Sequence, residues 1–145
     1  MIQFRVDMKP TGKGRPRSYL DRMTGRVSVY TDSKTATAER SVAYKAREAM
    51  TWHNPITTAC AVEIEAFYAL PKSTSKKREM LEVGKPATTK PDVDNVAKLV
   101  LDAMNGIVYE DDRLVSDLVI RKRKSEIGSD AILIRVRSME DEPCL

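Results

Sequence analysis

The segment from Lys90 to Asp117, KPDVDNVAKLVLDAMNGIVYEDDRLVSD, constrains the fold most, because it combines one amphipathic helix with acidic residues before and after it. Apolar residues recur at helical spacing across positions 96–103, which predicts one buried face. Asp94 is a favourable N-cap residue. Asn105-Gly106 provides a C-terminal stop, since glycine readily adopts the left-handed conformation. The segment therefore predicts a helix that starts at Asp94 and packs against the core.

Two groups of carboxylates flank this predicted helix. Asp92 and Asp94 lie two residues apart in an extended lead-in and at the helix start, so their side chains point to the same side. Glu110, Asp111 and Asp112 follow the helix, and a chain reversal there would return them to the first pair. Mg²⁺ binds through a few carboxylates together with phosphate oxygens and water. The pattern therefore predicts a metal centre that activates water against a phosphodiester.

A lysine shares the helix with these carboxylates. Lys98 follows Asp94 by one turn, and Asp102 follows Lys98 by one more turn. An ammonium at this position would neutralise the charge that develops on a phosphodiester during cleavage. The spacing leaves two interpretations of Asp102 open, which are a salt bridge to Lys98 and a part in the site itself.

Other acidic motifs fit the segment less well. A calcium-binding EF-hand loop that began at Asp92 would need glycine at Ala97 and glutamate at Ala103. Haloacid dehalogenase-type phosphatases place D-x-D-x-V after a buried apolar strand, whereas residues 87–91 read ATTKP. Helix capping and a tight turn would each explain one group of acids alone. They leave the combination of acids and lysine unexplained, so a phosphodiesterase is the favoured hypothesis.

The chain is basic, with a formal net charge of +4, which suits an anionic partner. Its basic residues gather in the segments 9–26, 72–78 and 121–124. The first segment opens with a loop rich in Gly and Pro, whose backbone N–H groups suit phosphate. This loop lacks the spacing of a nucleotide-binding P-loop, so no nucleotide cofactor is expected. The DNA contacts expected from these segments are Lys13, Arg15, Arg17, Lys72, Lys76, Lys77, Arg121 and Arg123.

Composition argues against several other classes of protein. There is no apolar run of membrane-spanning length and no secretory signal. Cys60 and Cys144 lack metal-site spacing, which indicates reduced thiols in a cytoplasmic protein. The single histidine, His53, argues against a histidine-cluster zinc site.

Hydrophobic periodicity predicts one α+β domain over residues 1–145, with a mixed sheet of about five strands and two main helices. Strands are expected near residues 1–8, 60–70, 114–120 and 131–137, with a hairpin over residues 19–30. Helices are expected from about 31–33 to 50, from 76 to 83 and after residue 94. The last two strands are expected to be adjacent and antiparallel. The polar tail over residues 138–145 is expected to be frayed.

The string KPDVDNVAKLVLDAMNGIVYEDDRLVSDLVIRKR resembles the signature of the RusA-like Holliday-junction resolvases, which are small dimeric endodeoxyribonucleases. The shared features are a D-x-D-N start, an internal lysine, a D-A-hydrophobic-N-G helix end and an aromatic-x-D-D turn. The matching residues are Asp92, Asp94, Asn95, Lys98, Asp102, Ala103, Asn105, Gly106, Tyr109, Asp111 and Asp112. The basic loop at residues 12–17 and the lysine-rich segment at 71–77 also resemble the family. One departure is Thr88-Thr89, where many relatives carry a histidine.

This resemblance implies a symmetric homodimer that resolves four-way DNA junctions in recombination and repair, by paired symmetric nicks. The metal ligands of the family correspond to Asp92, Asp94 and Asp112, and its catalytic lysine corresponds to Lys98. The expected cofactor is Mg²⁺, with Mn²⁺ as a substitute and Asp111 as an accessory ligand. Two alternatives stay open: a non-catalytic, junction-binding dimer of the same fold, and a metal-dependent phosphatase or nuclease that acts on other substrates.

Overall fold

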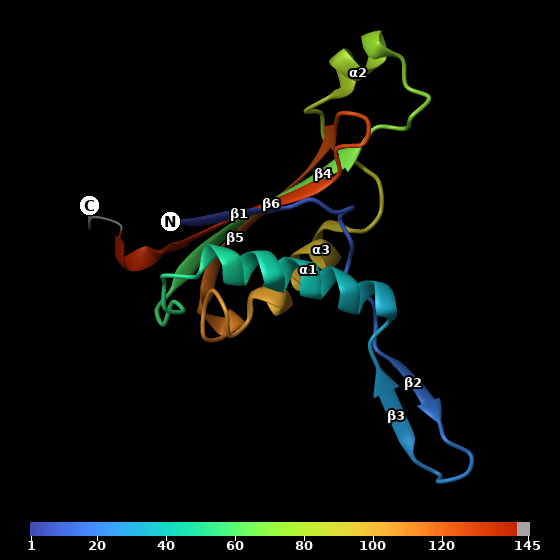
Figure 1. Ribbon diagram of the computed structural model, residues 1–145, viewed down its shortest axis with the longest axis vertical. Coiled ribbons are helices and arrows are strands. Elements are labelled where there is room, and N and C mark those ends of the chain that lie inside the picture. The colour runs from blue at the N-terminus through green and yellow to red at the C-terminus, as the bar shows by residue number, and fades with distance from the viewer. Residues whose placement is uncertain (142–145) are drawn as a thin grey trace.

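Four strands form one mixed sheet, and two helices pack on one of its faces (Figure 1). The computed structural model describes residues 1–141 of the chain. The elements are β1 Ile2–Val6, β2 Arg17–Leu20, β3 Val27–Tyr30, α1 Ser33–Ala49, β4 Cys60–Ala69, α2 Lys76–Glu82, α3 Val93–Met104, β5 Val115–Ser125 and β6 Ala131–Ser138. Two short 3-10 helices are η1, Asp112–Leu114, and η2, Met139–Asp141. The α+β class predicted from the sequence is confirmed.

The core lies between the sheet and the helices α1 and α3. Alternate residues of β4 are buried, as expected for a strand with one face against helices: Cys60, Val62, Ile64, Ala66 and Tyr68. The buried residues of α3 follow helical spacing, and α1 contributes small side chains, including Ala38 and Ala46. These small residues let α1 approach α3 and β1 closely. The opposite face of the sheet carries ion pairs, in which Glu63 and Glu65 contact Arg135.

The order of the strands differs from the prediction. The sheet has the order β1-β6-β4-β5, so it contains four strands where about five were expected. The β2–β3 hairpin forms a separate two-stranded sheet. β5 and β6 were expected to be adjacent, but β4 lies between them, parallel to β5 and antiparallel to β6. The apolar β4 takes the central position, whereas the charged β5 suits an edge of the sheet. Asp130 secures the crossing, because its carboxylate accepts the Ala69 N–H at 2.8 Å.

Two element ends also differ from the prediction. α3 has Asp92 rather than Asp94 as its N-cap residue, and Asp94 lies in the first turn, where the helix dipole also favours a carboxylate. The tail was expected to fray from residue 138, but Ser138 ends β6 and the Met139 N–H donates to the Ala59 carbonyl at 2.9 Å. Residues 142–145, including Cys144, lie outside the described residues. Cys60 is buried as a free thiol.

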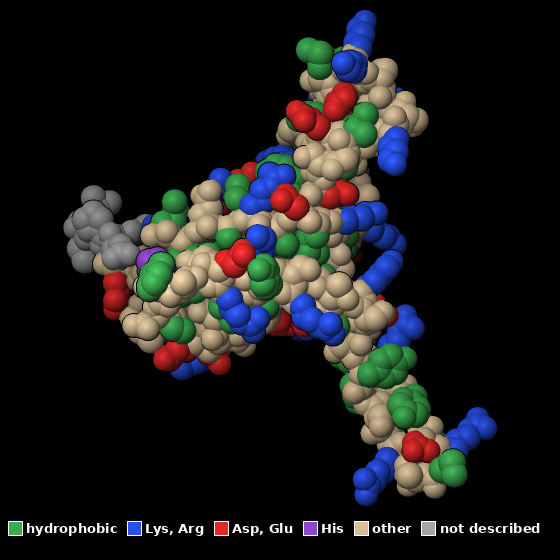
Figure 2. Space-filling view, in the orientation of Figure 1, with side chains coloured by type: hydrophobic (Ala, Val, Ile, Leu, Met, Phe, Trp, Pro, Cys, Tyr) green, Lys and Arg blue, Asp and Glu red, His purple; other side chains and the backbone are tan. Residues whose placement is uncertain are grey.

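Two extensions project in opposite directions from the body, α2 at one end and the β2–β3 hairpin at the other (Figure 1). Every residue of both hairpin strands is exposed. Lys and Arg side chains gather along the edge that joins the two extensions (Figure 2). The chain between α2 and α3 runs along this same edge (Figure 1). None of the helices within residues 1–141 has the length and apolar character to cross a membrane.

Candidate active site

Two unpaired carboxylates mark the start of α3. Asp92 has the extended backbone of an N-cap residue, with φ −66° and ψ 152°, yet its side chain makes no capping hydrogen bond. Asp94 follows in the first helical turn, and both residues are exposed. In the part of the chain that the structure describes, neither carboxylate has a side-chain hydrogen bond or ion pair. Both are therefore available to bind a cation at a positively polarised helix end.

Lys122 of β5 holds the backbone that leads into Asp92. Its ammonium donates to the carbonyl oxygen of Pro91 at 2.8 Å and to that of Thr89. It also lies 5.3 Å from the centre of the Tyr68 ring, within the range of a cation–π contact. The Lys90–Pro91 peptide bond between these two carbonyl groups is cis. Lys122 thus positions the chain immediately before the two carboxylates.

Sequence reasoning missed this role of Lys122, although a signal was present. Leu118 and Ile120 precede it on alternate positions of the same strand, and Ile120 packs against the core. Alternation of side chains along a strand places Lys122 on that same inner face. A lysine on the inner face needs acceptors close by, and the carbonyl groups of the lead-in supply them.

The basic loop over residues 9–16 packs against the same lead-in. A Cβ atom on Gly12 would lie 2.8 Å from Cβ of Pro91 and 3.0 Å from Cβ of Asn95, so only glycine permits this approach. The N–H of the next residue, Lys13, donates to the Asn95 carbonyl at 2.9 Å. This loop therefore supports the start of α3 through Pro91 and Asn95.

The side chain of Lys13 joins the two main helices. Its ammonium contacts Glu39 of α1 and lies 3.0 Å from the carboxylate of Asp102 on α3. Burial alone would lower the pKa of Lys13, but its hydrogen bonds to Glu39 and Asp102 prevail and raise that pKa. The interpretation of Asp102 as a salt-bridge partner of Lys98 is wrong, because Asp102 pairs with Lys13 instead. The DNA contact predicted for Lys13 gains no support, since its ammonium is already paired with two carboxylates.

A buried tyrosine fixes the second acidic group. Tyr109 is fully buried, and its hydroxyl donates to the Leu101 carbonyl of α3 at 2.8 Å. Burial, and next the negative charge of Asp112, raise the pKa of Tyr109, so the hydroxyl stays protonated. Asp111 then caps η1 by accepting the Arg113 N–H at 2.9 Å. Asp112 begins η1, which lies against α3, and its side chain is exposed.

The convergence expected for Asp92, Asp94 and Asp112 is not seen within residues 1–141. Among the described residues, no three His, Cys, Asp or Glu side chains lie close enough together to hold a metal ion. Lys98 is exposed and forms no ion pair with Asp94 or with any other described carboxylate. The arrangement therefore places one pair of carboxylates and one lysine along α3, with a separate acidic turn against the same helix.

The other residues predicted to contact DNA lie in several places. Arg15 and Arg17 are exposed at the base of the β2–β3 hairpin, and the lysines of the 72–78 segment are exposed on and before α2. Arg121 instead forms an ion pair with Glu63 of β4. The guanidinium of Arg123 donates to the Lys122 carbonyl at 3.2 Å. The predicted DNA contacts that project farthest from the body of the molecule are therefore those at the hairpin and at α2.

Two comparisons connect the chain with known proteins. A sequence model of the RusA endodeoxyribonuclease family matches residues 7–137, a range that contains all the carboxylates described above. The uncharacterized protein YqaN of Bacillus subtilis (strain 168) is 37% identical over 142 residues, covering 92% of this chain and 95% of that protein. The similarity to this relative therefore covers almost the whole chain, but the relative has no described activity.

Proposed function

The chain belongs to the RusA endodeoxyribonuclease family, and on this basis we propose that it resolves four-way DNA junctions by paired, symmetric, Mg²⁺-dependent nicks. The observation that carries the proposal is the pair of exposed carboxylates, Asp92 and Asp94, left without partners at a helix start inside the matched range. Unpaired, clustered negative charge is costly without a cation. A site of this kind suits an ion and a phosphodiester better than a purely structural role.

Asp92 and Asp94 would hold Mg²⁺ as hard oxygen ligands, with Asp112 and the accessory Asp111 contributing from the acidic turn. Phosphate oxygens of the DNA and water would complete the coordination shell of the ion. That composition is usual for Mg²⁺ on nucleic acids. When bound, the ion supplies an activated water and stabilises the leaving oxygen.

The residues of this chain position the reactants. Lys98 lies one turn beyond Asp94, and its unpaired ammonium would stabilise the additional negative charge on the attacked phosphate. Lys122 and Gly12 fix the lead-in, so the carboxylates need little reordering when DNA binds. Tyr109 does the same for the acidic turn through its bond to Leu101.

Paired nicks require two matched sites. A four-way junction has two-fold symmetry, and a C2 homodimer of this chain would present one carboxylate pair to each of two opposed strands. The basic edge between α2 and the β2–β3 hairpin would hold the arms mainly by their phosphates (Figure 2). Binding should therefore weaken steeply as salt is raised, because counterions are released when DNA binds.

One alternative has an observation in its favour. The absence of a three-carboxylate group within residues 1–141 would suit a junction-binding dimer that does not cleave. A single assay distinguishes the two functions. The protein is incubated with a labelled synthetic four-way junction in Mg²⁺ and, separately, in Mn²⁺. Linear duplex and a reaction with chelator serve as controls.

Symmetric nicks on the junction, absent from the duplex and from the chelated reaction, would support the resolvase. Tight junction binding with no nicks in either metal would instead support the dimer that binds junctions without cleaving them. Equal cleavage of junction and duplex would instead indicate a nuclease that does not select branched DNA.

A further inference from the structure

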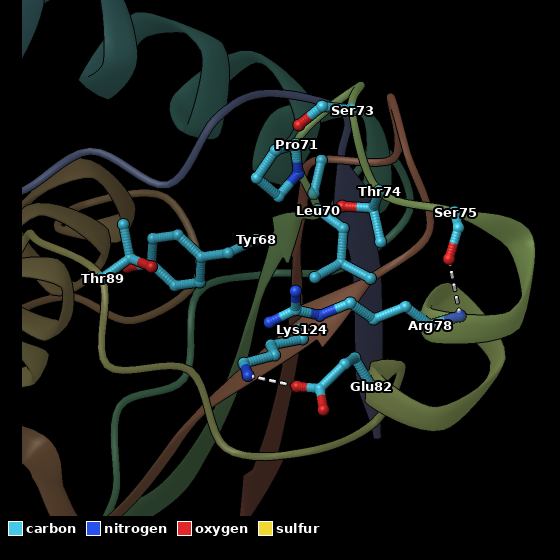
Figure 3. Close-up of a pocket in the computed structure, with 11 residues that line it drawn as sticks. Tyr68, Leu70, Pro71, Ser73, Thr74, Ser75, Arg78, Glu82, Thr89 and Lys124 are labelled. Carbon is cyan, nitrogen blue, oxygen red and sulfur yellow. Dashed lines mark hydrogen bonds and ion pairs between the residues drawn. The ribbon is translucent and has the colours of Figure 1, made fainter.

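A pocket of about 490 Å³ opens beside the lead-in to α3, between the end of β4 and α2 (Figure 3). Its apolar wall includes Leu70 and Pro71, and its polar wall includes Ser73, Arg78 and Thr89. None of these five residues is part of the carboxylate pair or of the acidic turn. The pocket is thus a separate cavity, which adjoins the candidate active site at the Thr89 backbone and the Tyr68 ring.

The charges around this pocket favour an anion. Within residues 1–141, the guanidinium of Arg78 has no carboxylate partner. The one acid of the pocket wall, Glu82, accepts hydrogen bonds from both Lys124 and Lys85. These bonds, that of Lys124 first, lower the pKa of Glu82 to about 2, so its charge is fixed and already compensated. A bound phosphate would therefore meet net positive charge together with several hydroxyl groups.

The pocket wall also contains an unsatisfied hydrogen-bonding group. Tyr68 is only 4% exposed, and its hydroxyl is the buried side-chain polar atom without a partner among the described residues. Burial raises the pKa of Tyr68 to about 12, so the hydroxyl remains a donor at neutral pH. Buried polar groups normally have partners, so an orphan hydroxyl on a residue that lines the pocket needs an explanation, which a ligand would supply.

The volume of the pocket and its position beside the carboxylates limit the class of ligand that it could bind. A volume near 490 Å³ lies in the range of about 300 to 1,000 Å³ that is usual for small-molecule sites. It is too small for a DNA duplex and far larger than a phosphate group alone. Thr89 precedes Asp92 by three residues, so their Cα atoms lie within about 11 Å of each other. A strand that reached the carboxylates could therefore place a neighbouring nucleotide in the pocket.

We propose that this pocket holds one unpaired nucleotide of the DNA strand, with its phosphate near Arg78 and its base against Leu70 and Pro71. That the ligand is DNA rests on the function proposed above. Apolar walls with a few hydrogen-bonding groups suit a base, and the unpaired guanidinium suits its phosphate. Bases next to a branch point are readily unstacked, so a junction would supply such a nucleotide.

The test follows backbone amide signals of the ¹⁵N-labelled protein by NMR, without divalent cations, so that it does not depend on cleavage. The probes are tetrathymidylate and an abasic tetramer from which all four bases are removed, which keeps every phosphate. The expected result is that amides around Leu70, Ser73 and Arg78 shift with tetrathymidylate, and that the abasic probe binds at least about tenfold more weakly.

Three variants in the pocket and two control variants outside it locate the site. Ser73→Trp should fill the pocket and abolish these shifts, whereas Thr57→Trp, at an exposed position outside the pocket, should not. Tyr68→Phe removes only the orphan hydroxyl, so it should leave the melting temperature unchanged or higher while weakening tetrathymidylate binding several-fold. Arg78→Gln should weaken both probes, and Arg47→Gln on α1 is its matched control.

Equal affinity for the intact and abasic probes would overturn the proposal, because the site would then read phosphate alone. Shifts confined to other surfaces, or shifts that survive Ser73→Trp, would overturn it as well. The failure of the proposed function would look different. A protein whose pocket amides respond as described but which cuts no junction in Mg²⁺ would keep the nucleotide pocket and lose the resolvase.

Discussion

At the scale of single residues, Lys122 positions the backbone that leads into Asp92, a role that its place in a run of basic residues did not indicate. A run of Arg and Lys on a strand usually marks a solvated or DNA-facing surface, and alternation divides that run between two faces. Lys122 and Lys124 turn toward the lead-in and α2, whereas Arg121 pairs with Glu63 on the opposite face. One short segment therefore performs two structural tasks besides any contact with DNA.

Replacing Lys122 with methionine keeps the length of the side chain and removes its donors. Loss of the bonds to Thr89 and Pro91 should lower the free energy of unfolding by about 2 kcal/mol in urea titrations. Because the lead-in would no longer be held in place, junction cleavage should fall between about tenfold and a hundredfold. Junction affinity without divalent cations should change little.

The matched control for this prediction is Lys34→Met, which removes a lysine from the exposed start of α1. It should leave both stability and cleavage near the values of the unchanged protein. Equal effects of the two substitutions would show that Lys122 has no special role in positioning.

At the scale of elements, most of the secondary structure could be predicted from the sequence, and the way the strands pair could not. The alternation in β4 and the periodicity of α3 identify both elements directly. Adjacent β5 and β6 were the natural expectation for a short connection, yet β4 lies between them. Strand order depends on which apolar strand takes the most buried position, a long-range property that local spacing does not encode.

The Glu82 side chain ties helix α2 to β5 through Lys124, and this contribution to stability should follow pH. Hydrogen bonds from Lys124 and Lys85 hold the pKa of Glu82 at about 2, against an ordinary value of 4.5. Because the folded pKa is depressed, the stabilisation is complete above pH 4.5 and is lost as the pH falls toward 2. Glu82→Gln should therefore melt at a lower temperature than the unchanged protein at pH 7, with the difference vanishing near pH 2.

Thermal unfolding followed by circular dichroism across this pH range would check the prediction. Glu48→Gln is a suitable comparison, because Glu48 pairs with Lys45 on the exposed surface of α1 rather than between two elements. A melting-temperature difference for Glu82→Gln that stayed constant from pH 7 to pH 2 would contradict the role assigned to its charge.

At the scale of the whole molecule, the acidic side chains predicted for the site do not form a group of three within residues 1–141. The identities of Asp92, Asp94 and Lys98 could be singled out from sequence, because residue type and spacing carry that information. Their distance from Asp112 could not, since it depends on how Tyr109 and η1 seat against α3. The roles of Gly12 and Lys13 could not be predicted from the sequence either, because both depend on contacts with α3, some 80 residues further along the chain.

If the protein is a symmetric dimer, unchanged and mixed dimers should give different DNA products. The purified protein should sediment at twice the 16.3 kDa mass of one chain. Mixed dimers of one unchanged chain and one Asp94→Asn chain, isolated through different affinity tags, should nick only one of the two opposed strands. Nicked junction should accumulate, whereas unchanged dimers should yield resolved duplexes. A monomeric protein that still made paired nicks would contradict this view.

The most direct test of the central claim, that the carboxylates at the start of α3 carry phosphodiester cleavage, is Asp94→Asn assayed on a four-way junction in Mg²⁺. Asp7→Asn, at an exposed acid after β1, is the control. Cleavage should be abolished by Asp94→Asn and kept by Asp7→Asn, while junction binding by Asp94→Asn is equal to or tighter than that of the unchanged protein, since a charge that repels phosphate is gone. Cleavage by Asp94→Asn at the rate of the unchanged protein would contradict the account.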